Sequence, residues 1–218
     1  MSVAIENFIK AIYNNDIHDI KNTKPGNIAK QLGISSAAAT DMAKKLASKR
    51  LIKYQKYQEL QLTEEGKQYA LNIVRKHRLW ESFLYKLFDM SLHDIHREAE
   101  LLEHQTSDFL AAQISSFLGH PKFDPHGDPI PNEDGQITTT DTSIPLAEAK
   151  EDQNYTIARL MSDDKDFFDF CAQNGIKYRN TLTVIKQFDK NNMTQISIGS
   201  NTIVLNENFT KIIYVDEN

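Results

Sequence analysis

Residues 25–63 read PGNIAKQLGISSAAATDMAKKLASKRLIKYQKYQELQLT, and this stretch decides the fold of the first part of the chain. Pro25 is a favoured residue of a first helical turn, and Gly33 is suited to end the short helix that begins there. Ser35 or Ser36 can then cap the next helix. Two short helices joined by a glycine-containing turn predict a helix-turn-helix. The inner faces of the two helices are Ile28, Ala29 and Leu32, then Ala39, Met42, Ala43 and Leu46.

The segments on either side of this motif complete a winged helix. Before it, four apolar residues recur at the spacing of one buried helical face: Ile5, Phe8, Ile9 and Ile12. After it, residues 51–63 alternate in part between apolar and polar side chains, with polar residues where a hairpin would turn. We therefore predict a β-wing over 51–63 and a winged helix-turn-helix domain over 1–66.

Two further helices are predicted after the wing, and the second of them carries an apolar stripe and a polar stripe of side chains. A long helix is predicted from Glu64 to about Phe88, and Ser91 can cap the helix that follows. One apolar stripe is expected along that following helix: Ile95, Ala99, Leu102, Thr106 and Phe109. A polar stripe lies beside it: His96, Glu100, Glu103 and His104. His77 and Glu81 are also four residues apart on the long helix, so this pair projects from one helix face.

The rest of the chain changes pattern. Residues 119–143 are rich in Pro, Gly, Asp and Thr without periodicity, so we expect a linker or an ordered loop there. Beyond it, the expected strands are 155–160, 181–187, 193–198, 202–205 and 211–215, and the expected helix is 163–174. The predicted fold class is mainly α with a small β domain: a helical domain over 67–131, a linker over 132–150 and a small β-barrel over 151–218.

The composition is that of a soluble globular protein, with 218 residues of which 40% are hydrophobic and 25% charged. The single cysteine, Cys171, excludes an intramolecular disulfide framework and a four-thiolate zinc site, and it fits a reducing compartment. The first residues lack the pattern of an export signal, and no apolar run approaches the ~18 residues of a membrane span. We therefore expect a cytoplasmic protein without a membrane partner.

The charge of the chain is unevenly distributed. The net charge is −5, yet nine Lys and Arg residues stand against Asp41 alone between Lys21 and Lys56. A short helix with small and hydroxyl side chains can enter the major groove of DNA, while lysines neutralise phosphates. We expect Ser35, Ser36, Ala37, Thr40 and Asp41 to face base edges, and Lys44, Lys45, Lys49, Lys53 and Lys56 to hold the backbone. The alternative is a basic face that is only solvated. Asp41 argues against DNA binding at its own position, because a carboxylate repels phosphate, although it can accept a hydrogen bond from cytosine.

The polar stripe predicts a second functional site. Three histidines and three glutamates on two adjacent helices are costly to bury unpaired, whereas a divalent cation neutralises carboxylates and uses imidazole lone pairs. The predicted metal ligands are therefore His77, Glu81, His96, Glu100, Glu103 and His104. A network of buried ion pairs is the alternative.

Other residues and other functions stay open at this point. Asp124 and His126 can supply an oxygen and a nitrogen ligand, although an ordinary turn also accounts for the Asp-Pro-His tripeptide. The acids that begin the helix at 163–174, Asp164 among them, are favourable there for structural reasons alone. One rival function is a carboxylate-bridged metalloenzyme in a helical bundle, but the Glu-x-x-His spacing it needs on two helices does not occur. The other is a metal-independent winged-helix regulator.

The order of helix-turn-helix, wing and paired helices bearing H-x-x-x-E and H-x-x-x-E-x-x-E-H resembles the diphtheria toxin repressor family of metal-dependent transcriptional regulators. The likeness is greatest to its manganese transport regulator branch. The matching segments are 5–13 (IENFIKAIY), 40–46 (TDMAKKL), 54–66 (YQKYQELQLTEEG), 75–79 (RKHRL), 96–104 (HREAELLEH) and 120–131 (HPKFDPHGDPIP). The last domain is similar to the family's FeoA-like, SH3-like β-barrel, so the resemblance covers nearly the whole chain.

The resemblance implies two metal sites in the helical domain, which would also carry the dimer contact. The residues that match one site, with those that longer members add after the second helix, are His77, Glu81, His96, Asp124, His126 and Asp164. Those that match the other are Asn7, Glu100, Glu103 and His104. The family places Asp or Met where this chain has Asn7, and a second acid of the manganese branch falls at Lys10.

The resemblance also implies a metal, a partner and a mechanism. Iron-type members carry a cysteine where this chain has Glu100, and oxygen and imidazole ligands without sulfur suit Mn²⁺, with Fe²⁺ next. Zn²⁺ or Co²⁺ can substitute in vitro. We expect a homodimeric repressor of metal-uptake genes that binds a palindromic double-stranded DNA operator, is not an enzyme and takes no small organic substrate. Candidate dimer contacts are Trp80, Phe83, Leu84, Phe109 and Phe117.

Overall fold

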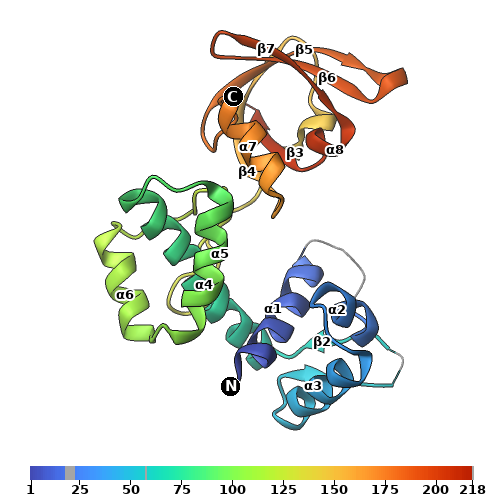
Figure 1. Ribbon diagram of the computed structural model, residues 1–218, viewed down its shortest axis with the longest axis vertical. Coiled ribbons are helices and arrows are strands. Elements are labelled where there is room, and N and C mark those ends of the chain that lie inside the picture. Colours follow the sequence, from blue (N-terminus) through green and yellow to red (C-terminus); the bar gives the residue numbers. More distant parts are fainter. Residues whose placement is uncertain (18–22, 57, 218) are drawn as a thin grey trace. The chain divides into compact units, whose positions relative to one another are not determined.

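The computed structural model describes residues 1–17, 23–56 and 58–217 (Figure 1). Lys21, one of the basic residues counted above, lies outside the described residues. The chain divides into two compact units: Met1–His77 with Leu101–Ala112 and Pro131–Ile137, and Arg78–Glu100 with Gln113–Ile130 and Thr138–Asn218. Each unit is described by itself. Within the described ranges, no helix has both the length and the apolar character needed to cross a membrane.

The first unit contains the predicted winged helix-turn-helix. Helices α1 (Val3–Ile17), α2 (Pro25–Gln31) and α3 (Ser36–Ser48) precede an antiparallel pair of short strands, β1 (Ile52–Lys53) and β2 (Gln61–Leu62). Gly33 adopts a φ of +64° directly after α2, a left-handed conformation that favours glycine and explains why the helix stops there. The Ser35 side chain caps α3 by accepting a hydrogen bond from the Ala38 N–H.

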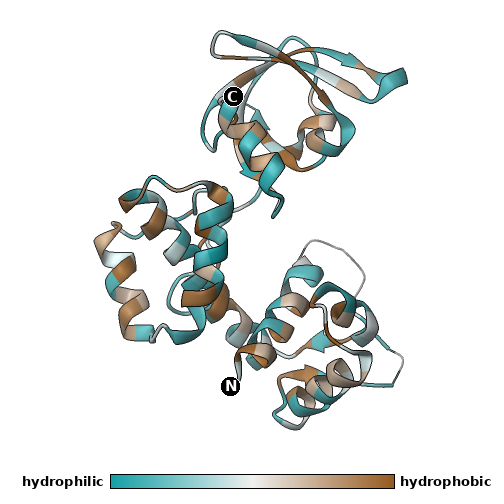
Figure 2. Ribbon diagram, in the orientation of Figure 1, coloured by the Kyte–Doolittle hydropathy of each residue, from teal (hydrophilic) through white to brown (hydrophobic). Residues whose placement is uncertain are grey.

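The core of this region uses the predicted inner faces. Phe8, Ile9 and Ile12 of α1 are fully buried, and Met42 of α3 packs at the edge of the same core. Figure 2 shows apolar and polar stretches alternating along α1 and α3, as amphipathic helices require. The other fully buried residues of α2 and α3 are Ile28, Ala39, Ala43 and Leu46.

The helices that follow are α4 (Glu64–Leu87), α5 (Leu92–Leu102), the 3₁₀ turn η1 (Glu103–Gln105) and α6 (Asp108–Phe117). The Ser91 hydroxyl accepts a hydrogen bond from the Asp94 N–H and donates one to its carboxylate, so the predicted cap of α5 is confirmed. The expected apolar stripe ending at Phe109 is wrong, because α5 ends at Leu102 and Phe109 is 75% exposed on α6. The Ser107 hydroxyl begins α6 by accepting from the Leu110 N–H.

The second unit contains a six-stranded antiparallel sheet in the order β3-β8-β4-β5-β6-β7. Its strands are β3 (Ile144–Pro145), β4 (Gln153–Leu160), β5 (Thr181–Phe188), β6 (Met193–Ile198), β7 (Asn201–Asn206) and β8 (Ile213–Glu217). Short helical segments join them: η2 (Leu146–Glu148), α7 (Lys165–Gln173), η3 (Asp189–Asn191) and α8 (Glu207–Thr210). Figure 1 shows the sheet curling into a small barrel, which agrees with the predicted fold class.

The barrel has an apolar core and begins earlier than expected. Tyr155 and Ile157 are fully buried, and burial of Cys171 raises the pKa of its thiol to about 12. Strand β3 pairs with β8, with Pro145 opposite Tyr214, so part of the sheet lies inside the segment that was expected to be linker.

Candidate metal centre and nucleic-acid interface

Helix α3 presents one face to the core and the opposite face to solvent. Ser35, Ser36 and Ala37 are exposed, while Thr40 is half-buried and its hydroxyl donates to the Ser36 carbonyl at 2.8 Å. Small side chains on an exposed helix allow a close approach to base edges in the major groove. The geometry therefore suits a recognition helix, and the base contacts stay a prediction.

The predicted phosphate-binding lysines share this solvent-facing side. Lys44, Lys45 and Lys49 on α3 are exposed, and so are Lys53 and Lys56 on the wing. The Asp41 carboxylate, which would repel phosphate, lies 3.9 Å from the Lys44 ammonium. Both side chains are exposed, Asp41 to 71% and Lys44 to 62%. An exposed pair of this kind contributes little, so Lys44 can still bind phosphate.

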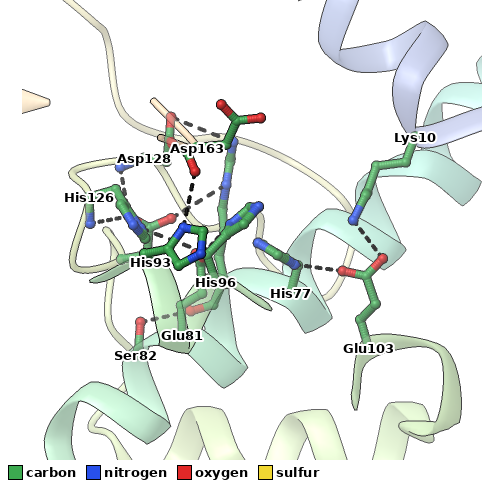
Figure 3. Close-up of polar contacts among 12 residues, drawn as sticks. Lys10, His77, Glu81, Ser82, His93, His96, Glu103, His126, Asp128 and Asp163 are labelled. Atoms are coloured by element: carbon green, nitrogen blue, oxygen red, sulfur yellow. Dashed lines mark hydrogen bonds and ion pairs between the residues drawn. The ribbon is translucent and has the colours of Figure 1, made fainter. Parts of the chain in front are cut away.

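One group of predicted ligands meets in the second unit, and we call Glu81, His96, Asp124 and His126 the loop cluster. The Glu81 carboxylate is 2% exposed. Its Oε1 lies 2.9 Å from the Nδ1 of His96 and 3.6 Å from the Nδ1 of His126. One ligand atom each of Glu81, Asp124 and His126 lies within 4.8 Å of the others. Figure 3 shows both histidine rings turned toward Glu81.

A tight turn places Asp124 and His126 in this cluster. The Asp124 Oδ1 accepts hydrogen bonds from the backbone N–H groups of His126 and Asp128, both at 2.9 Å. Gly127 has a φ of +93°, and a Cβ there would lie 1.9 Å from the Ala158 carbonyl of β4, so only glycine fits. The ordinary-turn interpretation is confirmed, and the same turn presents the two side chains inward.

The loop cluster holds more protons than its residue types usually carry. Burial raises the pKa of Asp124 to about 8, with the Glu81 carboxylate adding to the effect. Burial alone would lower the pKa of His126, but the nearby Glu81 carboxylate outweighs it and raises the pKa to about 9. Protons therefore neutralise the metal-free cluster near neutral pH, together with the Arg78 guanidinium 3.7 Å from Asp124 Oδ2, and a bound cation can replace the protons.

A second group, Glu6, Lys10, Glu103 and His104, meets in the first unit. We call it, together with Asn7 beside Glu6 on α1, the helix-one cluster. The Glu103 side chain is 0% exposed, and its Oε1 lies 2.7 Å from the Lys10 ammonium and 3.3 Å from the Nε2 of His104. Its Oε2 lies 2.6 Å from the Nδ1 of His77. Figure 3 shows Lys10 and His77 reaching this carboxylate from different helices.

Glu6 fixes the orientation of His104. One Glu6 oxygen lies 2.7 Å from the Nδ1 of His104, and the other accepts a hydrogen bond from the Tyr69 hydroxyl at 2.8 Å. Burial alone would raise the pKa of Glu6, but the hydrogen bonds from Tyr69 and His104 outweigh it and lower the pKa. With Nδ1 engaged, Nε2 is the nitrogen left to ligate a metal. Glu6 is absent from the predicted ligands because an acid in a first helical turn is ordinary.

A cleft of about 470 Å³ in the first unit opens onto Glu6, Glu103 and His104. Its lining also includes acidic side chains: Glu65, Asp108, Glu133 and Asp134. Lys76 and Arg75 also line the cleft and pair with Asp108 and Glu133, but the acids outnumber the bases. The excess negative charge raises the local concentration of cations, so the cleft suits the approach of a metal ion.

Both clusters contain buried polar atoms that have no hydrogen-bond partner among the described residues. These are His126 Nε2 and Asp124 Oδ2 in the loop cluster, and His104 Nε2 and Asn7 Oδ1 in the helix-one cluster. Such atoms are rare in folded proteins because each costs desolvation without compensation. A ring nitrogen with a carboxylate or amide oxygen is a donor set for a divalent transition metal, so the residues fit the predicted ion.

Two predicted ligands have other surroundings. Glu100 lies half-buried on α5, one turn after His96, and stays a predicted ligand. Asp164 is exposed at the start of α7, where its carboxylate accepts a hydrogen bond from the Asp166 N–H at 3.0 Å. Its structural role as a helix cap is therefore confirmed, and its role in a metal site stays a prediction.

Three protein-family models match the chain in succession. Residues 1–60 match the N-terminal DNA-binding domain of iron-dependent repressors, and residues 63–132 match their metal-binding and dimerisation domain. Residues 144–217 match the FeoA domain. The three matches follow the order of the wing, the helices and the barrel.

Individual relatives agree with these matches. A manganese-dependent transcriptional repressor, solved in complex with manganese, is 31% identical with a TM-score of 0.89, over 98% of this chain and 100% of that one. An uncharacterised HTH-type transcriptional regulator from Methanocaldococcus jannaschii is 32% identical over 118 residues, which are 54% of this chain and 94% of that protein. A probable metal transport system membrane protein from Chlamydia trachomatis is 41% identical over 70 residues, 32% of this chain but only 16% of that protein's length.

Proposed function

This chain belongs to the iron-dependent repressor family, and from that premise we propose that it binds double-stranded DNA as a homodimer when divalent metal ions occupy its two buried clusters. The family consists of metal-dependent transcriptional repressors and not of enzymes. One observation carries the proposal: each cluster contains a buried ring nitrogen and a buried oxygen that have no hydrogen-bond partner among the described residues. A cation supplies the missing partner to both kinds of atom.

The proposed ion is Mn²⁺, with Fe²⁺ second. The ligands offered are imidazole nitrogens and carboxylate or amide oxygens, and the one cysteine of the chain is buried in the barrel core. Hard oxygen donors without thiolate suit Mn²⁺, whereas affinity alone also admits Zn²⁺ or Co²⁺ in vitro. The similar repressor that was solved with manganese supports the same order.

Each cluster would hold its ion with residues of its own unit. In the loop cluster we assign Glu81, His96, Asp124 and His126, and in the helix-one cluster Asn7, Glu103 and His104. Three further residues, His77, Glu100 and Asp164, stay predicted ligands that we assign to neither set. The bound ion would supply positive charge at the buried carboxylates.

Helix α1 is the element through which the ion would act on DNA binding. It carries Asn7, while Phe8, Ile9 and Ile12 of the same helix are fully buried in the core of the winged helix-turn-helix. An ion held between Asn7 and His104 therefore restrains the helix on which the DNA-binding helices pack. By thermodynamic reciprocity, operator DNA would tighten metal binding by the same factor, typically about 5- to 150-fold.

Exposed aromatic residues support the proposed dimer. Phe109, Leu110 and Phe117 on α6 are 75%, 41% and 55% exposed, and several exposed apolar side chains on one helix are typical of an interaction surface. The rings of Trp80 and Phe83 pack edge to face, with their centroids 5.5 Å apart. Leu84, in contrast, is only 8% exposed. We therefore assign the dimer contact to the aromatic residues rather than to Leu84. A palindromic operator follows from two-fold symmetry, and cytoplasmic repression of metal-uptake genes completes the proposal.

The test is DNA binding at fixed ionic strength. Fluorescence anisotropy with the promoter beside the gene should report tight binding with Mn²⁺ or Fe²⁺ and weak binding with chelator. The double variant Glu103→Ala/His104→Ala should lose the metal dependence and keep the far-ultraviolet circular dichroism of the fold. Equal DNA affinity with Mn²⁺, Fe²⁺ and chelator would refute the proposal.

A second candidate, a metal-independent regulator, is favoured by one observation. Both buried glutamates already have charged or polar partners, Glu103 with Lys10 and His77, and Glu81 with His96. Such a network can hold the fold without an ion. Calorimetric titration with Mn²⁺ separates the two candidates, because the network alone predicts no saturable binding.

A further inference from the structure

Lys10 is a buried lysine that is not among the predicted metal ligands. It lies on α1 and is 8% exposed, although lysine is among the residues least often buried. Its ammonium lies 2.7 Å from Glu103 Oε1, within the first unit (Figure 3). A buried lysine of this kind needs a negative partner, and Glu103 is that partner.

The same oxygen faces the atom best placed to bind a metal. Glu103 Oε1 lies 3.3 Å from His104 Nε2, the ring nitrogen that has no hydrogen-bond partner among the described residues. The other Glu103 oxygen lies 2.6 Å from His77 Nδ1. An ion held by His104 and Glu103 would therefore contact Oε1, where the ammonium already lies.

Two cations cannot share one buried carboxylate oxygen at little cost. Like charges in a low-dielectric interior repel strongly, and screening by salt is weak there. The ammonium sits on a flexible four-carbon stem, so it can withdraw when a divalent ion arrives. The ion, in contrast, is fixed by its ligands.

We propose that Lys10 is an internal competitor for the metal at the helix-one cluster. In the metal-free protein its ammonium holds Glu103, and it gives up that oxygen when the ion binds. Lys10 thereby raises the metal concentration at which the cluster fills, and so sets the threshold of the repressor. This inference rests on the proposed function, since it requires that the helix-one cluster bind a divalent ion.

The test compares two substitutions at one position. Lys10→Met keeps most of the apolar stem and removes the charge, whereas Lys10→Arg keeps the charge. Mn²⁺ affinity is measured by calorimetry in a chain that also carries Glu81→Gln, so that the loop cluster contributes little. Lys10→Met should bind Mn²⁺ at least about tenfold more tightly than the parent, a factor within the usual range of coupling between sites. Lys10→Arg should bind no more tightly than the parent.

A matched control separates local competition from a general charge effect. Lys30 is an exposed lysine on α2, in the same unit, and Lys30→Met removes the same charge from the surface. It should leave Mn²⁺ affinity unchanged. Metal-free thermal unfolding of each variant reports whether it folds, and Lys10→Gln replaces Lys10→Met if that variant does not.

The possible results separate the inference from the proposed function. In the otherwise wild-type chain, Lys10→Met should also lower the Mn²⁺ concentration at half-maximal DNA binding. If Mn²⁺ promotes DNA binding by the wild type, and Lys10→Met needs the same or a higher Mn²⁺ concentration, Lys10 has only a structural role. The inference is then overturned. If no variant binds Mn²⁺ and DNA binding ignores it, the proposed function fails, and the inference with it.

Discussion

The loop cluster and the helix-one cluster are built from the same residue types but are neutralised in different ways. In the helix-one cluster, a lysine ammonium lies 2.7 Å from the buried Glu103 carboxylate. In the loop cluster, raised pKa values keep protons on Asp124 and His126. An incoming metal ion therefore competes with a lysine ammonium at one cluster. At the other it competes with exchangeable protons, beside the Arg78 guanidinium whose Nε lies 3.7 Å from Asp124 Oδ2. Metal binding at two clusters of similar composition can therefore depend on different factors: the position of a lysine side chain at one, and pH at the other.

The largest expected effect tests whether the loop cluster is a metal site at all. Glu81→Gln removes the carboxylate that both histidines face at 2.9 Å and 3.6 Å. We expect Mn²⁺ binding at this cluster to weaken by at least about 100-fold, since even outer partners of ligands are worth ~10–100-fold. Calorimetry should report one fewer bound ion per chain.

Glu64→Gln is the matched control for this change. It removes the same charge from an exposed position on the same helix, α4, so Mn²⁺ affinity should be unchanged. An unaltered ion count in Glu81→Gln would mean that the loop cluster is an ion-pair network, and the comparison between two metal sites would collapse.

The next effect concerns pH and follows from the protons on the loop cluster. The pKa of Asp124 is about 8 and that of His126 about 9, so both groups are protonated near neutral pH without metal. Ligands must be deprotonated, so binding releases protons and affinity rises with pH until it passes these pKa values. Each released proton changes the affinity about tenfold per pH unit.

Calorimetry in buffers of different ionisation enthalpy counts the released protons directly. The Glu81→Gln variant should lose most of this pH dependence, because its loop cluster no longer binds the ion. A metal affinity in the wild type that stays constant between about pH 6 and about pH 9 contradicts the assignment of protons to this cluster.

A smaller effect tests how His104 is held in the helix-one cluster. Glu6→Ala removes the carboxylate that lies 2.7 Å from His104 Nδ1. We expect Mn²⁺ affinity at this cluster to fall by about tenfold, the lower end for an outer partner of a metal-ligating histidine. Tyr69→Phe removes only the hydroxyl that donates to Glu6, so its effect should be weaker. Equal affinity in Glu6→Ala and wild type would mean that the ion does not use His104.

The sequence predicted the elements of both clusters better than it predicted their contacts. Helical spacing placed His77 with Glu81 and His96 with Glu100 on shared helix faces, and the structure brings Glu81 and His96 within 2.9 Å. Spacing cannot reveal where a helix stops when hydroxyl groups compete for the backbone. Thr106 has an extended backbone conformation and the Ser107 hydroxyl caps the next helix, so the stripe toward Phe109 breaks there.

Contacts between distant segments were harder still to predict. Lys10 and Glu103 are 93 residues apart, and Glu6 and His104 are 98 apart, so no local pattern joins them. Lys10 stood out only as a basic residue where the resembled branch has an acid. Strand β3 was missed because two residues, one of them proline, carry no alternation.

The smallest effect tests whether the clusters act on DNA binding separately from the phosphate contacts. Lys44 is exposed on α3, and Lys44→Ala should weaken binding to every DNA sequence a few-fold and lower the salt slope by about 0.9, as the loss of one phosphate contact requires. The Mn²⁺ concentration at half-maximal DNA binding, measured at matched saturation, should not move, because neither cluster is altered. A loss confined to the operator would instead assign Lys44 to base recognition, and a shifted Mn²⁺ midpoint would mean that the DNA-binding face and the clusters are not separable.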